Sequence, residues 1–324
     1  MSATSRSKGW TLALSVSDTP DLDALGMFEN DDKRVLSAVL TPLVYHGARI
    51  AYGGRIEPPT ETNFTQEIST QLGAAYRASG EALKSRPFIH YLRANDLQRE
   101  GKDKVWAHAL RLGAFSEIKL LSDETTVATL LPSGTMADVY VGSSRTATVQ
   151  KADELGAVPQ IVPLFMTPPT GDPLAGMRRS MAKETDARIM MGGRAGVSKH
   201  PDGSYWGDGK SGIAAEAVAT LEANKPLIVI GGIGGASRDV AGALGLIGDE
   251  DLVPRPQPAD PTEQAMLANY WASIDKVRPF AADYQARLTA ANLLKEARRL
   301  AVSDSYTEIA ELVMTMLTRL IPSA

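Results

Sequence analysis

The sequence contains no cysteine, and its four histidines are dispersed along 324 residues. Without cysteine the chain forms no disulfide and offers no thiolate ligand, and scattered histidines lack the spacing of a zinc site. We therefore expect no metal site and no cofactor. No apolar run is long enough for a signal peptide or a membrane span, which favours a soluble, cytoplasmic protein.

The charge balance gives no excess of basic residues. Lysine and arginine number 34 against 38 aspartates and glutamates, for a formal net charge of −4. A nucleic-acid-binding protein usually carries a basic surface, so we expect no nucleic-acid partner and only a local positive field. A hydrophobic content of 44% allows a large core in one domain or two.

Three segments share one form, a short apolar run that ends in a glycine pair. They are Ala48–Arg55, Ala187–Arg194 and Leu227–Gly232. Their apolar runs stop at Gly53-Gly54, Gly192-Gly193 and Gly231-Gly232. Such a run is typical of a buried parallel strand, and glycine permits positive φ or close ligand approach in the turn that follows. Because ligands of open α/β sheets bind at strand ends, we expect the glycine pairs to form a pocket floor.

An arginine follows two of these glycine pairs. Arg55 and Arg194 carry planar forks of donors that suit phosphate or carboxylate, so they are candidate contacts for an anionic small molecule. The alternative is an ordinary surface ion pair. Their shared position after a strand favours ligand contact.

Strand and helix patterns alternate along most of the chain. We predict strands at the three glycine-ended segments and over Trp10–Val16, Pro87–Arg93 and Glu117–Leu121. We predict helices over Asp31–His46, Asn63–Ser79, Lys104–Leu112, Leu174–Thr185 and Gly212–Ala223. A further helix begins at Gly234-Gly235-Ala236-Ser237. Parallel strands require crossover connections, so this order predicts an α/β fold with a doubly wound parallel, Rossmann-like sheet. The two near-repeats, Ala48–Arg55 and Ala187–Arg194, are candidate neighbouring strands.

The middle of the chain is less regular. Asp123–Ser144 is a candidate short β excursion, followed by a helix near Thr146–Leu155 and a strand over Gln160–Phe165.

We divide the chain into a disordered terminus (1–9), a ligand-binding α/β domain (10–250), a proline-rich linker (251–261) and a C-terminal helical region (262–324). The linker holds four prolines and no periodicity, and Thr262–Leu320 reads as three helices. Their apolar stripe, such as Leu312, Met316 and Leu320, indicates packing on the α/β domain or on a partner subunit, with a separate effector role as the alternative.

Two segments come close to known nucleotide-binding motifs but do not match them. Gly203–Ser211 holds a lysine before a helix, yet Ser204 stands where a phosphate loop requires glycine. Gly232–Ser237 ends in serine where a dinucleotide fingerprint requires glycine, and it lies far from the first strand. The helix N-termini at Gly212 and Ala236 still present amides that favour an anion.

Glu216 lies one turn into the helix that begins at Gly212. Its carboxylate either faces the glycine-lined cleft or stabilises the helix N-terminus through the dipole. The sequence leaves both interpretations open.

Taken together, these segments resemble the SLOG superfamily, Rossmann-like relatives of the LOG phosphoribohydrolases and of the ligand-sensing domains of TRPM channels. The resemblance is carried by Ser15–Leu22 with Leu25-Gly26, Ala48–Gly54, Ala187–Arg194, Gly212–Ala217 and Lys225–Ala236. It is strongest to the prokaryotic branch of conflict systems that includes the sensor domain of the Thoeris defence effector. It implies binding of a nucleotide or an ADP-ribose-like derivative of NAD.

The expected ligand contacts are turn residues after the first strand, the glycines at strand ends and helix starts, and nearby cations. They are Ser17, Asp18, Gly53, Gly54, Arg55, Arg178, Gly192, Gly193, Arg194, Lys210, Gly212, Gly231, Gly232, Gly234 and Gly235. Our first hypothesis is a homo-oligomeric sensor whose ligand shifts an oligomeric or conformational equilibrium, with a hinge in Ala195–Ser211. The alternative is an N-glycosidase in which Glu216 assists water attack and Arg178 or Arg179 holds phosphate.

The chain departs from the LOG pattern Pro-Gly-Gly-x-Gly-Thr-x-x-Glu, which only Gly212 and Glu216 match. Ser211 stands in place of the proline, and Ala215 replaces one of the paired acids of the conflict-system branch. Loss of one acid favours binding over hydrolysis. A third interpretation is a structural protein with a vestigial cleft, which predicts no small-molecule ligand.

Overall fold

The computed structural model describes residues 9–56, 63–79, 85–168, 171–200 and 202–321. The expected disorder of residues 1–9 therefore falls almost wholly outside the described residues. The described strands are β1 (Thr11–Ser17), β2 (Arg49–Tyr52), β3 (Phe88–Arg93), β4 (Ser116–Ser122), β5 (Thr125–Ser133), β6 (Met136–Val141), β7 (Ser144–Val149), β8 (Ala187–Gly192) and β9 (Leu227–Ile230).

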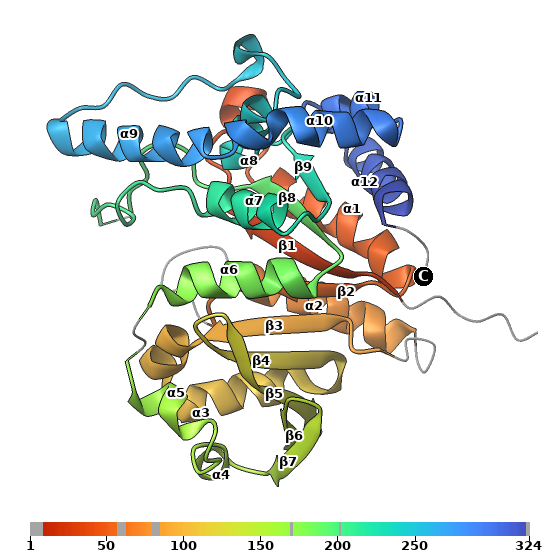
Figure 1. Ribbon diagram of the computed structural model, residues 1–324, viewed down its shortest axis with the longest axis vertical. Coiled ribbons are helices and arrows are strands. Elements are labelled where there is room, and N and C mark those ends of the chain that lie inside the picture. The colour runs from red at the N-terminus through yellow and green to blue at the C-terminus, as the bar shows by residue number, and fades with distance from the viewer. Residues whose placement is uncertain (1–8, 57–62, 80–84, 169–170, 201, 322–324) are drawn as a thin grey trace, which may run out of the picture.

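Helices cover both faces of the sheet, with α6 and α7 on one and α1, α2 and α3 on the other (Figure 1). The α-helices are α1 (Asp31–Tyr45), α2 (Phe64–Ala78), α3 (Ala94–Leu112), α4 (Ala152–Leu155), α5 (Val162–Met166), α6 (Pro173–Glu184), α7 (Gly212–Glu222), α8 (Gly235–Ala243), α9 (Pro261–Asp275), α10 (Ala281–Ala290), α11 (Leu294–Leu300) and α12 (Tyr306–Leu320).

The sheet order is β7-β6-β5-β4-β3-β2-β1-β8-β9, so β2 to β7 lie on one side of β1 and β8 and β9 lie on the other. The chain winds from β1 through β2, β3 and β4 by parallel pairings, then returns to place β8 and β9 on the other side of β1. The doubly wound α/β prediction is confirmed. The winding direction reverses between β1 and β8, which is where ligands of such sheets bind.

The prediction that the two near-repeats are neighbours is wrong. β2 and β8 both pair with β1 and flank it on opposite sides. The reason is that each run makes the same kind of central, buried strand, whereas strand order depends on the crossovers between them.

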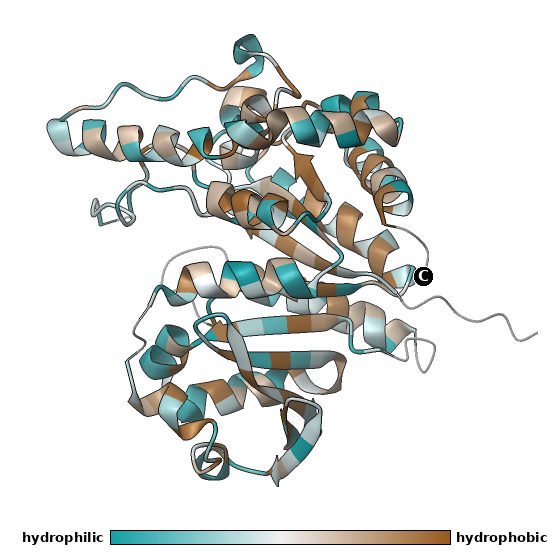
Figure 2. Cartoon of the chain, in the orientation of Figure 1, coloured by the Kyte–Doolittle hydropathy of each residue, from teal (hydrophilic) through white to brown (hydrophobic). Residues whose placement is uncertain are grey.

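Two core layers follow from the alternation of side chains along the strands. Leu12, Leu14 and Ile50 join the larger cluster, while Ala13 and Ala51 join a smaller one with Met177 and Met181 of α6. Hydrophobic residues accordingly concentrate along the strands and on the inner sides of α1 and α12 (Figure 2).

The irregular middle segment is an antiparallel meander, so the expected β excursion is confirmed and extends further than predicted. The helix predicted near Thr146–Leu155 is wrong over its first half, because Ser144–Val149 pairs with β6 as strand β7. Gly134 and Gly142 have φ of 59° and begin the β5–β6 and β6–β7 turns, a conformation that glycine adopts without strain.

The strand predicted over Gln160–Phe165 is also wrong. These residues form the short helix α5, which has a proline in its first turn. Proline lacks a backbone donor for a strand ladder but suits the start of a helix, and this effect outweighs the apolar run.

The C-terminal region holds four described α-helices, α9 to α12, where the sequence predicted three. Asn292 has φ of 55° and separates α10 from α11. The buried residues Ile309, Val313, Met316 and Leu317 of α12 face the core, and α12 packs against α1. The apolar stripe of α12 therefore packs on the α/β domain, which is one of the two packing partners that the sequence predicted.

Residues 252–258 have no helix or strand, yet they do not run free of the α/β unit. The side chain of Arg255 is buried and forms ion pairs with Asp21 at 2.7 Å and with Asp239 at 2.5 Å. Both partners lie near the carboxyl ends of the central strands, so this segment is tied to the α/β core.

Candidate functional site

A cavity of about 420 Å³ lies at the carboxyl ends of β1 and β2, below the loop that follows β8. α6 and α7 complete its walls. Its lining comprises Leu14, Ser15, Val16, Ser17, Tyr52, Gly53, Arg55, Leu174, Met177, Arg178, Met181, Arg194, Gly196, Ser198, Trp206, Gly207, Gly209, Lys210, Ser211, Gly212, Ile213 and Glu216. Its size and its place beside the β1–β8 reversal suit a small-molecule site.

Arg188 anchors the polar wall of this cavity from within the sheet. It lies on β8 with a side chain 1% exposed, and its Nη1 donates to Ser15 Oγ at 2.7 Å. Its Nε donates to Thr220 Oγ1 of α7 at 2.7 Å. Burial lowers the pKa of Arg188, while Glu216 opposes that shift, and an arginine remains charged under such conditions.

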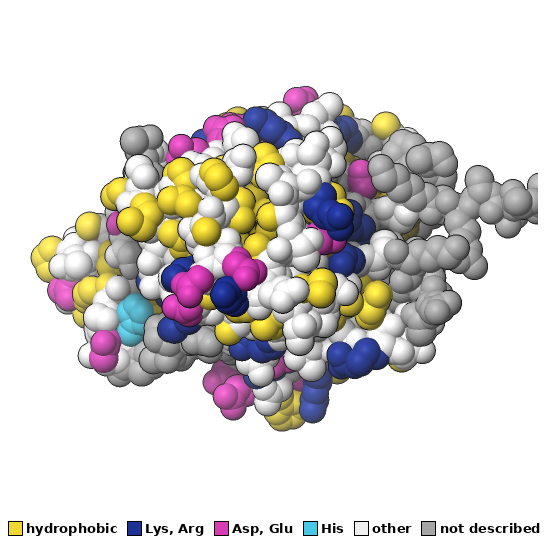
Figure 3. Space-filling model, turned by 90° about the horizontal axis from the view of Figure 1, so that it is seen from below, with side chains coloured by type: hydrophobic (Ala, Val, Ile, Leu, Met, Phe, Trp, Pro, Cys, Tyr) yellow, Lys and Arg dark blue, Asp and Glu magenta, His cyan; other side chains and the backbone are white. Residues whose placement is uncertain are grey.

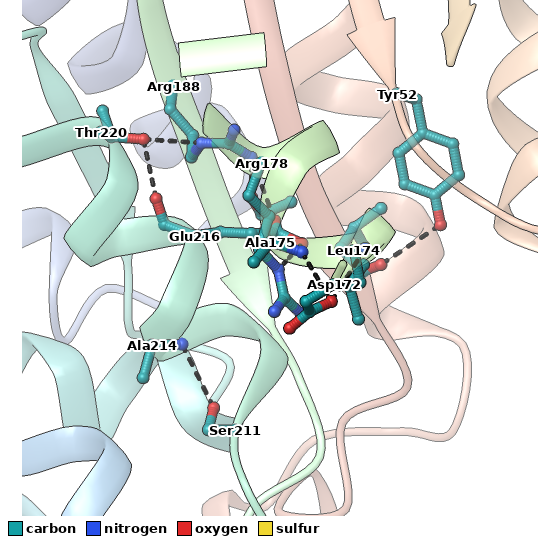
Figure 4. Close-up of polar contacts among 12 residues, drawn as sticks. Tyr52, Asp172, Leu174, Ala175, Arg178, Arg188, Ser211, Ala214, Glu216 and Thr220 are labelled. Carbon is teal, nitrogen blue, oxygen red and sulfur yellow. Dashed lines mark hydrogen bonds and ion pairs between the residues drawn. The ribbon is translucent and has the colours of Figure 1, made fainter. Parts of the chain in front are cut away.

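Glu216 of α7 is the carboxylate that balances this buried cation (Figure 4). Its Oε2 accepts from Arg188 Nη1 at 3.0 Å and from the Ser15 hydroxyl, and its Oε1 lies 3.6 Å from Arg178 Nε of α6. The side chain is 20% exposed and lines the cavity. The interpretation in which Glu216 faces the cleft is therefore the one that the structure supports.

Two guanidinium groups share this single carboxylate. Nη2 of Arg188 and Nε of Arg178 are buried and have no hydrogen-bond partner among the described residues. Burying charge that is incompletely paired is costly, so Arg178, which lines the cavity, favours an anion that brings further acceptors. Planar guanidinium groups suit phosphate oxygens in particular.

The N-terminus of α7 lies beside Arg178. Ser211 caps the helix by accepting from the amide of Ala214 at 3.2 Å. Gly212 has no side chain, and a methyl group there would come within 3.0 Å of Arg178 Nη2. Glycine at this position therefore lets Arg178 lie across the helix N-terminus.

The loop after β8 brings an aromatic side chain into the cavity wall. Arg194 Cζ lies 3.7 Å from the centroid of the Trp206 ring, in a cation–π contact. Lys210 pairs with Asp208 at 2.5 Å and is largely exposed. On the molecular face in Figure 3, basic and acidic side chains are interspersed.

The structure brings eight of the predicted site residues to one cavity, namely Ser17, Gly53, Arg55, Arg178, Arg194, Lys210, Gly212 and Glu216. The other predicted residues do not line it: Asp18, Gly54, Gly192, Gly193, Gly231, Gly232, Gly234 and Gly235. Most of the latter are glycines.

The glycines outside the lining meet protein atoms at close range. Gly192 and Gly193 have φ of 62° and 99° and turn the chain after β8. A methyl group at Gly231 would come within 2.6 Å of Ala301 O, and one at Gly232 within 1.7 Å of Ser303 O. At the end of β9, the backbone of the C-terminal region packs against the glycines. The sequence had predicted a ligand at this position.

The N-terminus of α8 is likewise occupied by the protein itself. The amide of Gly235 donates to Asp21 Oδ2 at 2.7 Å, and Asp21 also pairs with Arg255. A methyl group at Gly234 would come within 2.6 Å of Asp21 Cβ. The carboxylate of Asp21 therefore occupies the N-terminus of α8, where the helix dipole favours negative charge.

Sequence reasoning missed Ser15, Arg188 and Trp206. A signal existed for Arg188, because it is the only charged side chain within the apolar run of β8, and a charge in a buried strand requires a partner. Trp206 stands in a glycine-rich polar loop, where a large aromatic is unusual. Ser15 carries no such signal.

Among the described residues, no group of three or more histidines, aspartates and glutamates is placed to hold a metal ion. None of the described helices has the length and hydropathy needed to cross a bilayer.

The fold and the cavity define a Rossmann-like α/β protein with a ligand-sized cavity at the point where the sheet winding reverses. A family model described as SLOG cluster2 matches residues 6–152 and 160–303, which is most of the chain. The protein therefore belongs to this SLOG family, and membership suggests binding or processing of a nucleotide-related ligand. No curated protein and no solved structure matches the chain.

Proposed function

We propose that the protein binds a nucleotide-derived small molecule of the ADP-ribose or NAD-derivative class and acts as a sensor in a prokaryotic defence or signalling system. The observation that carries the proposal is the cavity wall in which Arg178 and Arg188 share the carboxylate of Glu216. Membership of the SLOG family supports a nucleotide-related molecule as the anionic ligand of this cavity.

Sensing requires binding without rapid turnover, and the environment of Glu216 favours that outcome. Its Oε2 is engaged by Ser15 and Arg188, and its Oε1 faces Arg178. A general base needs a carboxylate oxygen available to water or to a reacting group. Here Arg188 and Ser15 hold the carboxylate, and the carboxylate holds Arg178, which lines the cavity, in position for a ligand.

The test is thermal or chemical unfolding with ADP-ribose, cyclic ADP-ribose isomers, NAD and AMP, followed by mass analysis of the recovered ligand. A ligand at a hundredfold its Kd raises stability by about 2.7 kcal/mol. Stabilisation with intact ligand supports the sensor. The absence of stabilisation by every compound contradicts it and favours a vestigial cleft.

A second candidate is hydrolysis of an N-glycosidic bond, favoured by the partial exposure of Glu216 to the cavity. The substitution Glu216→Gln separates the two functions. If the protein is a sensor, the variant retains ligand binding, because the amide oxygen of glutamine still accepts from Arg188 and Ser15 and no attraction for a phosphate is lost. If the protein is a hydrolase, release of base or ribose phosphate by the wild type is lost in the variant.

A further inference from the structure

Two planar groups lie close to the ring of Trp206. Arg194 Cζ lies 3.7 Å from the ring centroid, and the ring centroid of His200 lies 3.3 Å away with an interplanar angle of 31°. Both separations place the group over the ring rather than at its edge. Since two groups at such distances cannot share one face, Arg194 and His200 lie on opposite faces of the indole.

The backbone around Trp206 presents this stack on a small antiparallel bridge. The amide of Trp206 donates to Ser198 O at 3.0 Å, and Lys199 pairs with Tyr205 as an isolated bridge. α9 braces the bridge from outside, because Lys199 Nζ lies 2.7 Å from Glu263 Oε1 and the Tyr205 hydroxyl donates to Asp260 at 3.2 Å. The indole is therefore held in the cavity wall by a supported loop.

The cavity thus combines two kinds of recognition surface. Arg178 and the N-terminus of α7 suit phosphate, and Trp206 supplies a large planar π-face in the same lining. A guanidinium over an indole occupies the position in which a nucleobase stacks. Neither Arg55 nor Lys210 offers such a face.

We propose that Trp206 is the base-recognition residue of this site. The planar base of the ligand takes the place of Arg194 on the indole, and the displaced guanidinium turns to the ligand phosphates. The exchange replaces a cation–π contact with base stacking and a charge-assisted hydrogen bond. The inference rests on the proposed function and adds a preference for purine nucleotides, whose larger ring system stacks over more of the indole.

The experiment compares ADP-ribose with ribose 5-phosphate, which has a phosphate but no base, by calorimetry on the full-length protein. In Trp206→Leu we expect ADP-ribose affinity to fall roughly 5- to 150-fold, the range for loss of one base–aromatic stack. Ribose 5-phosphate affinity remains at its wild-type value. Trp206→Phe, which keeps an aromatic face, retains most of the ADP-ribose affinity.

Arg194→Met provides the reciprocal measurement. It removes the cation that we assign to phosphate in the bound state, so we expect weaker binding of ribose 5-phosphate as well as of ADP-ribose. Intrinsic fluorescence of the wild type gives a readout that needs no cavity variant: ADP-ribose quenches it and ribose 5-phosphate does not. The matched control Trp271→Phe, on α9 and outside the cavity lining, preserves the quenching.

The outcomes separate the two proposals. ADP-ribose that binds Trp206→Leu as tightly as the wild type overturns the base-recognition role and leaves the proposed function intact. ADP-ribose that binds without quenching the wild type does the same. Wild-type protein that binds no nucleotide probe overturns the proposed function and the inference together.

Discussion

At the scale of single residues, a buried relay of side chains fixes the protonation of two histidines. Arg111 Nη2 lies 2.9 Å from His108 Nδ1, His108 Nε2 lies 2.8 Å from His90 Nδ1, and His90 Nε2 lies 3.0 Å from Gly54 O. A guanidinium only donates, so His108 accepts at Nδ1 and donates from Nε2. His90 then accepts from His108 and donates to the carbonyl of Gly54, and both rings are neutral.

This relay predicts a dependence of stability on pH. Burial lowers the pKa of His90 to about 4, and burial likewise lowers the pKa of His108 well below its usual value. Between the folded and unfolded pKa values the unfolded chain binds more protons. Stability is therefore complete above about pH 6.5 and falls as the pH drops towards 4, by about 1.4 kcal/mol per pH unit for each histidine.

The measurement is the free energy of unfolding in denaturant at pH values from 7.5 down to 5. His90→Gln reduces the slope, because the titrating ring is gone. The control His46→Gln alters an exposed ring at the end of α1, outside the relay. Equal slopes in all three proteins would contradict the neutral relay.

At the scale of elements, α9 supports the loop that closes the cavity. Asn269 Nδ2 donates to Asp208 O at 2.8 Å, and Ser211 N donates to Ser273 Oγ at 3.4 Å. Gly209 lies so close to α9 that a methyl group there would come within 2.3 Å of Met266 O. The contacts recur every three or four residues and therefore use one side of the helix.

We predict that Asn269→Ala loosens this loop and weakens ligand binding. Loss of one hydrogen bond contributes about 1 kcal/mol, so amide exchange near residues 207–211 accelerates roughly fivefold. Hydrogen exchange with mass analysis measures the effect. Gln264→Ala, on an exposed position of the same helix, is the control, and equal acceleration in both variants would argue against the brace.

At the scale of the whole molecule, the C-terminal helices close the third strand end. Gly231 and Gly232 follow β9 and lie against the backbone of Ala301 and Ser303. The hydroxyl of Tyr306 donates to Asp31 Oδ1 at 2.6 Å and joins α12 to α1. The α/β unit and the C-terminal region therefore share one continuous hydrophobic core.

Gly232→Ala tests this close packing. The added methyl group would lie 1.7 Å from Ser303 O, a backbone atom that moves only if the α11–α12 connection moves. We expect a loss of about 1–3 kcal/mol of stability and faster amide exchange across residues 294–320.

The matched control is Gly248→Ala. Its methyl group would come within 2.4 Å of the carboxylate of Glu250, which is the end of a flexible side chain and can turn away. We expect wild-type stability for this variant. A neutral Gly232→Ala variant would refute the proposed packing constraint.

The sequence by itself determined the elements and the class of fold. Apolar runs ended by glycine pairs predicted β2, β8 and β9, and their alternation with amphipathic segments predicted a doubly wound sheet, because periodicity and glycine turns are local properties. It also marked Glu216, Arg178 and Arg194, three of the residues that line the cavity. Local pattern failed at β7 and α5, where hairpin pairing and a proline decided the outcome.

Only the tertiary structure decided which side chains meet. Ser15 and Glu216 stand 201 residues apart in the chain, and Arg188 is separated from Glu216 by 28, so no local spacing records the cluster that they form. Three similar glycine pairs likewise have different neighbours: Gly53 lies on the cavity, whereas Gly231 and Gly232 lie on the C-terminal backbone. A glycine makes close approach possible, and the crossovers that fix strand order determine what approaches it.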